Sequence, residues 1–361
     1  MIRKFGKFFV FYIISCIVTA MLFTIALRFI GYHPAATIRN KISTRFRERQ
    51  ENVLIAQTDA ADENSYYEKT EAFGIFDNTP DHAFPATVIY KLVMDHFSSE
   101  LPEGKTQKKL LFIGFDGYRT DALENILGSE ESAILTVGEQ GGIYYSFSGG
   151  VSGENEQDTS TDPTWTAMLT GGWGDYNGIT RNGQMKNEQE TFLTSLAKQG
   201  YSGTFNTGWQ ELLNVCFIPD IELSIREKLP VKYQYIPDDA DMYYEILSQI
   251  ARPSSSDPDG PDVIFAKFSF PDATGHTGGY NSANALYQEK CREADQRGFS
   301  LIRTLKERST YALEDWLIII STDHGGKGKG HGGQSILERS TWIAINKPVP
   351  VTDEYLYYAL H

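Results

Sequence analysis

Three short stretches of continuous apolar sequence restrict the fold more than any other feature of the chain. They are residues 110–115 (LLFIGF), 263–270 (VIFAKFSF) and 316–320 (WLIII). A continuous rather than alternating apolar run of this length is typical of a strand buried on both faces, as in a parallel sheet covered by helices. With 361 residues, 41% of them hydrophobic, the chain can bury a large core of this kind. The sequence therefore predicts a three-layer α/β/α fold with a mostly parallel central sheet.

Each apolar run delivers a carboxylate close to its C-terminal end. Open α/β sheets bind ligands at the carboxyl ends of their strands. A single aspartate there would be explained as a helix cap or a turn residue. Three such sites, two of them with histidines attached, are harder to explain in that way. The side chains at this edge that can hold divalent cations are Asp116, Asp272, His276, Asp323, His324 and His331.

A second signal lies in residues 159–171 (TSTDPTWTAMLTG). Asp162 suits an N-cap and Pro163 suits the first helical position, so we expect a helix to begin immediately after Thr161. This places the Thr161 hydroxyl beside free backbone N–H groups at the positive end of a helix dipole, which favours phosphate binding. The alternative is that Thr161 and Ser160 are ordinary polar residues that lead into a helix.

Residues 283–308 predict an amphipathic helix that packs on the sheet. Its apolar and small residues recur at three- and four-residue spacing, with charged residues between them. We assign this helix a structural role. Asp295 is interpreted as a solvated helix carboxylate, with the orientation of a bound ligand as the alternative.

The net charge of −14 limits the choice of partners. Nucleic-acid polymers and anionic membrane surfaces need basic patches, so neither is expected to bind this chain. An acidic protein can still bind phosphate where metal ions reverse the local field.

The N-terminus predicts a membrane anchor. A short basic tail, residues 1–7, precedes an almost unbroken apolar run, residues 8–27. At about 1.5 Å per residue this run can span a bilayer core of about 30 Å. A cleaved signal peptide is the alternative, but its apolar region usually has about 7–15 residues, and no small-residue cleavage site follows Leu27.

Topology and compartment are less constrained. Basic residues lie on both sides of the apolar run, so the positive-inside rule does not decide between the two orientations. We expect a cytoplasmic N-terminus, a membrane-proximal stalk or lead-in at residues 28–83, and an extracytoplasmic compact domain at residues 84–361. Cys216 and Cys291 form one disulfide or stay free, and their number does not decide between the two.

Four motifs together carry a family resemblance: FDGYRTDAL at 115–123, TSTDPTWTAMLTG at 159–171, PDATGH at 271–276 and TDHGGKGKGHGG at 322–333. In content and order they resemble the alkaline phosphatase superfamily, and within it the type I phosphodiesterase and nucleotide pyrophosphatase branch. The resemblance covers about residues 108–335. It implies the alkaline phosphatase-like fold for the compact domain and a catalytic, phosphoryl-transferring function.

The resemblance also implies roles for individual residues. Thr161 corresponds to the nucleophile, because it lies nine residues before the threonine of a Thr-Gly pair at Thr170. Asn182 corresponds to the asparagine that binds phosphoryl oxygens. The implied ligands are Asp116, Asp323 and His324 for one metal, with Thr161 bridging to it, and Asp272, His276 and His331 for the other.

Two positions depart from the family pattern. His331 follows His324 by only seven residues, whereas nucleotide pyrophosphatases place their last histidine much further along. Asn177 stands where those enzymes carry a histidine. The resemblance therefore implies the family and its reaction class, not one characterised substrate specificity.

The ligand types suit two Zn²⁺ ions best, with Mn²⁺ and Fe²⁺ as alternatives. We expect a membrane-anchored hydrolase that cleaves phosphodiester or pyrophosphate bonds through a phosphothreonine intermediate. Its substrate would be a nucleotide or a lipid-like phosphate ester. A phosphomonoesterase or phosphotransferase of the same superfamily is the alternative, and a non-catalytic membrane-anchored binding protein is a more distant one. A sulfatase is nearly excluded, because the run Thr161–Asp162–Pro163 lacks the cysteine or serine that a sulfatase needs.

Further residues are candidates for substrate contact. Arg119 and Arg181 could meet the phosphoryl oxygens, although arginines are more often surface or structural residues. Aromatic residues could form a nucleobase or lipid pocket, although aromatics near a core more often pack. These are Trp165, Trp173, Tyr176 and Trp209.

Overall fold

The computed structural model describes residues 34–183, 187–252, 260–352 and 355, together with the isolated Thr19 and Met21. Apart from these two residues, the predicted tail and membrane anchor lie outside the described residues. Within the described part, no helix is both long enough and apolar enough to cross a membrane. The chain divides into two compact units, Met1–Leu54 and Ile55–His361.

The second unit begins earlier than the sequence predicted. Helix α2 spans Pro34–Glu71, and its residues from Ile55 onward belong to the unit that carries the sheet. Ile55 and Tyr66 are 3% and 2% exposed, respectively, although the segment as a whole is polar. The expected boundary near Phe84 therefore falls inside the compact unit, because a few widely spaced apolar residues are enough to bury one side of this helix.

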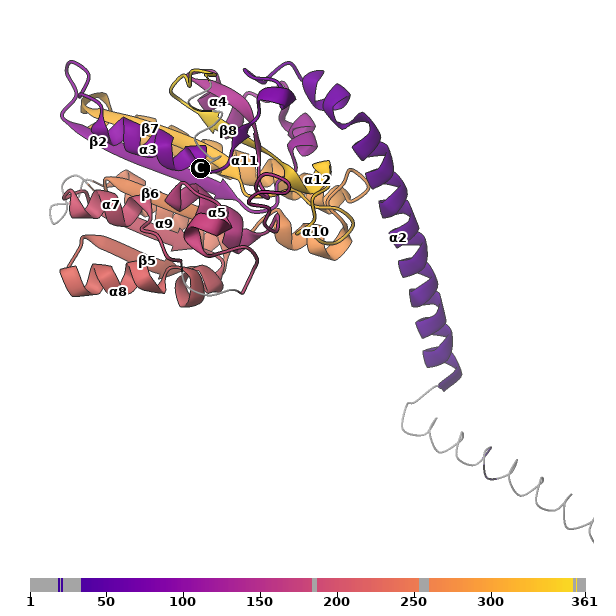
Figure 1. The fold of residues 1–361 in the computed structure, drawn as a ribbon. Coiled ribbons are helices and arrows are strands. Elements are labelled where there is room, and N and C mark those ends of the chain that lie inside the picture. Colours follow the sequence, from indigo (N-terminus) through magenta and orange to yellow (C-terminus); the bar gives the residue numbers. More distant parts are fainter. Residues whose placement is uncertain are drawn as a thin grey trace, which may run out of the picture. The chain divides into compact units, whose positions relative to one another are not determined.

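A single sheet of eight strands forms the centre of this unit (Figure 1), in the order β1-β3-β8-β7-β2-β6-β4-β5. All neighbouring strands run parallel except that β8 is antiparallel to both β3 and β7. The prediction of a mostly parallel sheet is confirmed. The strands are β1 (Phe84–Pro85), β2 (Gln107–Phe115), β3 (Gly142–Phe147), β4 (Gly203–Thr207), β5 (Val231–Tyr235), β6 (Val263–Phe268), β7 (Glu314–Thr322) and β8 (Ser340–Ile345).

Helices cover both faces of the sheet. Besides α2 they are α3 (Val88–Ser98), α4 (Ala133–Gly138), α5 (Thr161–Thr170), α6 (Gly174–Asn177), α7 (Phe192–Lys198), α8 (Ile218–Glu227), α9 (Asp239–Ala251), α10 (Asp272–Gly278), α11 (Ala285–Glu307) and α12 (Ile336–Arg339). Short 3-10 or π turns lie at Pro80–His82, Thr120–Ile126, Leu212–Cys216 and Tyr311–Leu313.

The two faces of the sheet have separate cores. Along β2, Leu110 and Phe112 pack with α3, α5 and α7, whereas Leu111, Ile113 and Phe115 pack with α4, α9 and α11. Successive side chains of a strand point to opposite faces, so a continuous apolar run is what burial on both sides requires. The layering expected from the sequence follows from this alternation.

Strand register brings the predicted ligands to one edge. Phe115, the last residue of β2, is opposite Phe268 of β6 and Thr322 of β7. All three strands run parallel, so their carboxyl ends lie at the same level of the sheet. Asp116 and Asp323 follow directly after β2 and β7, and Asp272 begins α10 shortly after β6.

The long helix α11 matches the predicted amphipathic segment, but Asp295 on it is not solvated. Its side chain is 1% exposed, and its Oδ1 accepts a hydrogen bond of 2.9 Å from the backbone N–H of Ile134. Asp295 thus ties α11 to α4 at a buried position. Cys216 and Cys291 are both free and buried, in the cores on opposite faces of the sheet.

Candidate active site

Asp116, Asp323 and His324 form the more buried of two neighbouring ligand groups. Nε2 of His324 lies 3.3 Å from Oδ1 of Asp116 and 3.4 Å from Oδ2 of Asp323. The second carboxylate is oriented by the backbone, because Oδ1 of Asp323 accepts a hydrogen bond of 3.0 Å from the N–H of Gly117. These are the three side chains that the sequence assigned to one metal.

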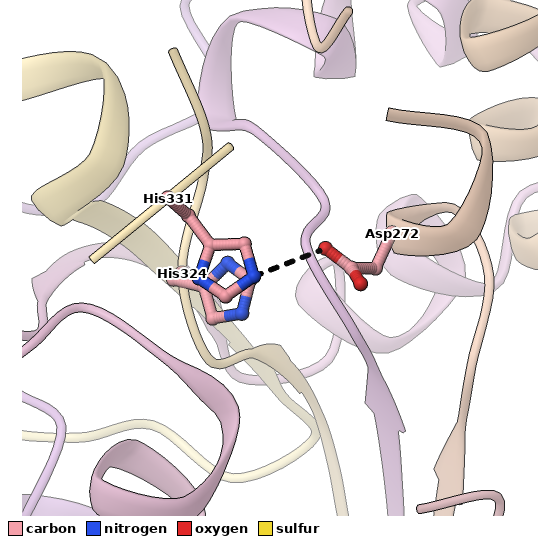
Figure 2. A group of neighbouring side chains, drawn as sticks. All are labelled: Asp272, His324 and His331. Atoms are coloured by element: carbon pink, nitrogen blue, oxygen red, sulfur yellow. Dashed lines mark ion pairs between the residues drawn. The ribbon is translucent and has the colours of Figure 1, made fainter. Parts of the chain in front are cut away.

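Asp272, His276 and His331 converge on the neighbouring position. Nε2 of His276 lies 3.3 Å from Oδ2 of Asp272, and Nε2 of His331 lies 3.8 Å from Oδ1 of the same carboxylate. The two Nε2 atoms are 3.2 Å apart. Figure 2 shows Asp272, His324 and His331 turned toward one another, with the rings of the two histidines stacked at 3.8 Å. The structure therefore brings His331 into the site despite its unusual spacing.

The three histidines have the same hydrogen-bonding arrangement at Nδ1. Nδ1 of each is within hydrogen-bond distance of a backbone carbonyl oxygen: 3.0 Å for His276 and Lys329, 2.8 Å for His324 and Gly325, and 3.1 Å for His331 and Thr159. A carbonyl oxygen accepts only, so Nδ1 carries the proton that is donated. Each Nε2 is then available to a cation, which is the arrangement found for metal-ligating histidines.

The residues fit a pair of divalent cations. In the described part of the chain, the buried atoms Asp116 Oδ1, Asp323 Oδ2 and His324 Nε2 have no hydrogen-bond partner, although they face one another. Buried carboxylates without compensation are costly. A proton on Nε2 of His324 can supply part of the missing positive charge, and a metal ion coordinated by the same three atoms can supply more. Carboxylate and imidazole ligands are those of Zn²⁺ and similar ions.

The pKa shifts in the cluster also favour the binding of a cation. Burial opposes a charged imidazole, yet Asp323 and Asp116 raise the pKa of His324 to about 10. Burial together with the neighbouring Asp116 raises the pKa of Asp323 above its ordinary value. Burial and the neighbouring His324 lower the pKa of His331 to about 4, so this ring is neutral at pH 7. The cluster favours positive charge between its carboxylates and keeps His331 in the form that binds metals.

Two side chains of the site were missed by the sequence analysis. The ammonium group of Lys267 forms a buried ion pair with Oδ2 of Asp116, and the hydroxyl of Tyr280 donates to Oδ1 of Asp272. Lys267 had a usable signal, because a lysine within an otherwise apolar strand must find a charged partner. Tyr280 had none, since only the fold brings it to α10.

Helix α5 begins at Thr161, with Ser160 as its N-cap. The helix therefore begins two residues earlier than predicted, and Asp162 lies inside its first turn rather than capping it. Trp165 of α5 packs so closely on β2 that a Cβ at Gly114 would clash with its ring. Thr161 is two residues after Thr159, whose carbonyl oxygen accepts from His331, so the predicted nucleophile begins the helix beside the ligand groups.

Asp162 holds the surroundings of the helix N-terminus together. Its Oδ1 accepts from the indole N–H of Trp209 at 2.8 Å, and its Oδ2 accepts from the N–H of Gly183 at 2.8 Å. Its own N–H donates to Oδ1 of Asn182 at 2.8 Å. Asn182, the residue expected to contact phosphoryl oxygens, is therefore a direct neighbour of the first turn of α5.

Other candidates lie elsewhere. Arg119 is fully buried and pairs with Asp59, Asp62 and Asp121, so it is a structural arginine rather than a substrate contact. Trp165 and Trp173 are buried in the core, whereas Tyr176 is 48% exposed. The indole of Trp209 is hydrogen-bonded to Asp162 in the first turn of the helix that begins at Thr161.

Comparisons with known proteins identify the family of the chain. The family described as type I phosphodiesterase / nucleotide pyrophosphatase has a model that matches residues 110–352. Two solved structures of murine ectonucleotide pyrophosphatase / phosphodiesterase 5, one of them an inactive variant in complex with AMP, are each 20% identical to this chain. Their TM-scores are 0.43 and 0.42, with 62% and 61% of this chain covered.

This chain spans 58% of the length of each of those two chains. No curated protein matches it. The family model, however, matches more than half of the chain, including every residue of both ligand groups. The chain therefore belongs to the type I phosphodiesterase / nucleotide pyrophosphatase family.

Proposed function

We propose that this chain hydrolyses phosphodiester or pyrophosphate bonds, with two divalent cations, Zn²⁺ by preference, and Thr161 as the nucleophile. The observation that carries the proposal is the convergence of three histidine Nε2 atoms and three carboxylates beside the N-terminus of α5. Family membership supports the reaction class. The family also includes nucleotide pyrophosphatases, which supports a nucleotide as the substrate, with a lipid-like phosphate ester as the alternative.

The two ligand groups divide the work of holding the cations. Asp116, Asp323 and His324 would hold one, and Asp272, His276 and His331 would hold the other. When bound, such a pair supplies positive charge that favours the alkoxide form of the nucleophile and stabilises the departing oxygen. The carbonyl oxygens behind the three rings keep each Nε2 directed at the site.

Thr161 carries out the covalent step. Its hydroxyl gives up its proton to solvent, and Oγ forms a bond to phosphorus while the bond from phosphorus to the leaving oxygen breaks; the leaving oxygen takes up a proton from solvent, and the product is a phosphothreonine. Water then attacks phosphorus and gives up a proton to solvent, and the Thr161 Oγ leaves and is protonated again. In the first turn of α5, Pro163 has no N–H and the Thr164 N–H donates to the Ser160 carbonyl oxygen, so the N–H groups of Thr161 and Asp162 are those that would stabilise the nonbridging oxygens. The Asp162 N–H becomes available when the Asn182 side chain turns its amide toward the same oxygens.

We further propose that residues 8–27 anchor the chain in the cell membrane, with the catalytic domain outside the cytoplasm. The anchor rests on the length of the apolar run, and the orientation rests on the basic residues 1–7 that directly precede it. Protease treatment of intact cells tests it: digestion of the catalytic domain from outside supports this orientation, and full protection contradicts it.

The reaction is tested with the purified, metal-loaded chain on bis(p-nitrophenyl) phosphate and p-nitrophenyl phosphate. Faster turnover of the diester supports the proposal, and a strong preference for the monoester favours a phosphomonoesterase instead. Thr161→Ala should abolish turnover and keep both metals. Thr164→Val is the matched control, because Thr164 is a buried threonine of the same helix. Activity in Thr161→Ala would show that another residue is the nucleophile.

A further inference from the structure

A cavity of about 460 Å³ lies at the end of β3 and along the chain that follows His331. This volume is within the range of small-molecule sites, about 300–1,000 Å³. Its wall combines one charged side chain with aromatic and small polar ones. The residues that define it for the argument are Tyr67, Tyr145, Phe147, Ser152, Gln334 and Arg339.

Arg339 is the charged group of this cavity. Its Nε and Nη2 donate to the carbonyl oxygens of Ser148 and Gly150, at 3.3 and 2.6 Å. In the described part of the chain it forms no ion pair with a carboxylate. Burial lowers its pKa below the ordinary value, although an arginine remains charged at any physiological pH. The cavity thus holds a partly desolvated cation, on which the carboxylate of Glu156 acts without forming an ion pair.

The aromatic wall is fixed before any ligand binds. The Phe147 ring stacks on Trp173 at 5.9 Å and lies 5.6 Å from the Arg339 guanidinium. The Tyr145 ring stacks on Phe76 at 3.8 Å, and its hydroxyl donates to Thr70. A planar group can therefore pack in the cavity without rearrangement of these rings.

Hydrogen bonds connect the segment that carries His331 to one wall of the cavity. Gln334 lies three residues after His331, and its Nε2 donates to the carbonyl oxygen of Gln157 at 2.7 Å. Thr159 accepts from His331 through its carbonyl oxygen and donates its hydroxyl to the Gly333 carbonyl at 2.7 Å. The segment that leads to the nucleophile is thus bonded to the segment that runs from His331 into the cavity.

We propose that this cavity binds the distal part of the leaving group, and that this part carries a negative charge on a planar or apolar body. The inference rests on the proposed function: because Thr161 is assigned to the cation held by Asp116, Asp323 and His324, the oxygen that leaves in line would depart toward the other group, which includes His331. Arg339 pairs with the anion, and Phe147 and Tyr145 contact the body. The site therefore selects diesters whose leaving group bears a second anionic group.

The test uses two diesters that differ in charge but hardly in shape: bis(p-nitrophenyl) phosphate and bis(4-carboxyphenyl) phosphate. The measured quantity is the ratio of kcat/KM for the carboxylate diester to kcat/KM for the nitro diester. Arg339→Gln should lower this ratio at least tenfold, and Arg339→Lys should lower it less. Arg297→Gln, at an arginine on α11 that pairs with Glu293, is the control and should leave it unchanged. An unchanged ratio in Arg339→Gln would overturn the inference.

A second pair of variants leaves Arg339 and its two carbonyl contacts intact. Ser152→Asp places a negative charge at the cavity wall and should lower the same ratio, whereas the isosteric Ser152→Asn should not. Equal ratios in these two variants count against the inference.

Should the chain hydrolyse neither diester, the proposed function fails but the cavity is still tested. Calorimetric binding of bis(4-carboxyphenyl) phosphate is then compared between Thr161→Ala and Thr161→Ala/Arg339→Gln. Weaker binding to the double variant supports the cavity, and equal binding overturns it.

Discussion

Nε2 of His331 lies 3.2 Å from Nε2 of His276, while Nδ1 of each ring faces a backbone carbonyl oxygen. Two ring nitrogens that both present lone pairs repel each other at this distance unless a proton or a cation lies close to both. Asp272 adds two carboxylate oxygens to the same space. This pair of histidines is therefore the clearest sign that the second ligand group is built for a cation.

Replacement of His331 by Gln should weaken one metal site selectively. A direct ligand contributes at least as much as the outer partners of a ligand, whose loss costs about 10–100-fold in affinity. We expect this loss for one of two metal ions in titrations with a competing chelator. His82→Gln, at an exposed histidine outside both groups, is the control. Two ions bound with unchanged affinity in His331→Gln would place the ligand elsewhere.

Replacement of Lys267 should strengthen metal binding, whereas replacement of His331 should weaken it. Its ammonium is buried against Asp116, so it competes with a metal ion for that carboxylate and repels the ion. Lys267→Met should raise the affinity for the metal held by Asp116 by roughly tenfold or more. It should also destabilise the metal-free protein by about 3–5 kcal/mol, the usual cost of breaking a buried ion pair.

The control for Lys267→Met is Lys108→Met. Lys108 is also buried on a strand of the sheet and pairs with Asp315 at 2.8 Å, but Asp315 belongs to neither ligand group. Urea unfolding should show a similar loss of stability in both variants. Chelator titration should show tighter metal binding in Lys267→Met alone. Weaker metal binding in Lys267→Met would mean that Lys267 mainly orients Asp116.

Asp162 connects the helix that begins at Thr161 to Trp209 and to the loop of Asn182. Asp162→Ala removes both carboxylate contacts, so the loop should lose its fixed position. A misplacement of about 1 Å in a positioning group can cost about 100-fold in rate. We expect a fall in kcat/KM of that order with unchanged metal content, compared with the exposed Asp175→Ala as control. A loss of metal in Asp162→Ala would contradict a role confined to positioning.

The parts predicted from the sequence are those whose signal is local. A strand buried on both faces must be apolar at every position, so β2, β6 and β7 could be predicted from the sequence. Because these strands are parallel, Asp116, Asp272 and Asp323 were expected at one edge of the sheet. The position of His331 could also be predicted from local sequence, since the glycines between it and His324 allow the chain to turn back.

The parts that were not predicted depend on contacts between distant segments. Ile55 and Asp59 belong to a polar helix, and only the fold shows that Asp59 pairs with Arg119. The same holds for Tyr280, which reaches Asp272 because α10 ends just before it. Burial of Asp295 likewise depends on α4, which no periodicity within α11 reveals.

Asp295 gives a prediction about pH. Burial raises the pKa of this carboxyl to about 6 in the folded protein, whereas an unfolded aspartate titrates near 3.9. The folded state therefore binds more protons between these two values, and stability falls as the pH rises through this window. The loss amounts to about 3 kcal/mol and is complete above about pH 7. Below about pH 4 the folded protein keeps the full stability that it has with Asp295 protonated.

Asp295→Asn removes this titration and keeps an Oδ1 that can accept from the Ile134 N–H. At pH 8 the variant should be more stable than the parent chain by up to about 3 kcal/mol, because no charge is buried. The difference should shrink toward zero as the pH falls to about 4. Urea unfolding of the full chain at pH 4, 6 and 8 measures it, with Glu289→Gln at an exposed position of the same helix as control. If Asp295→Asn and the parent chain change in stability equally with pH, then Asp295 is ionised throughout and another partner compensates its charge.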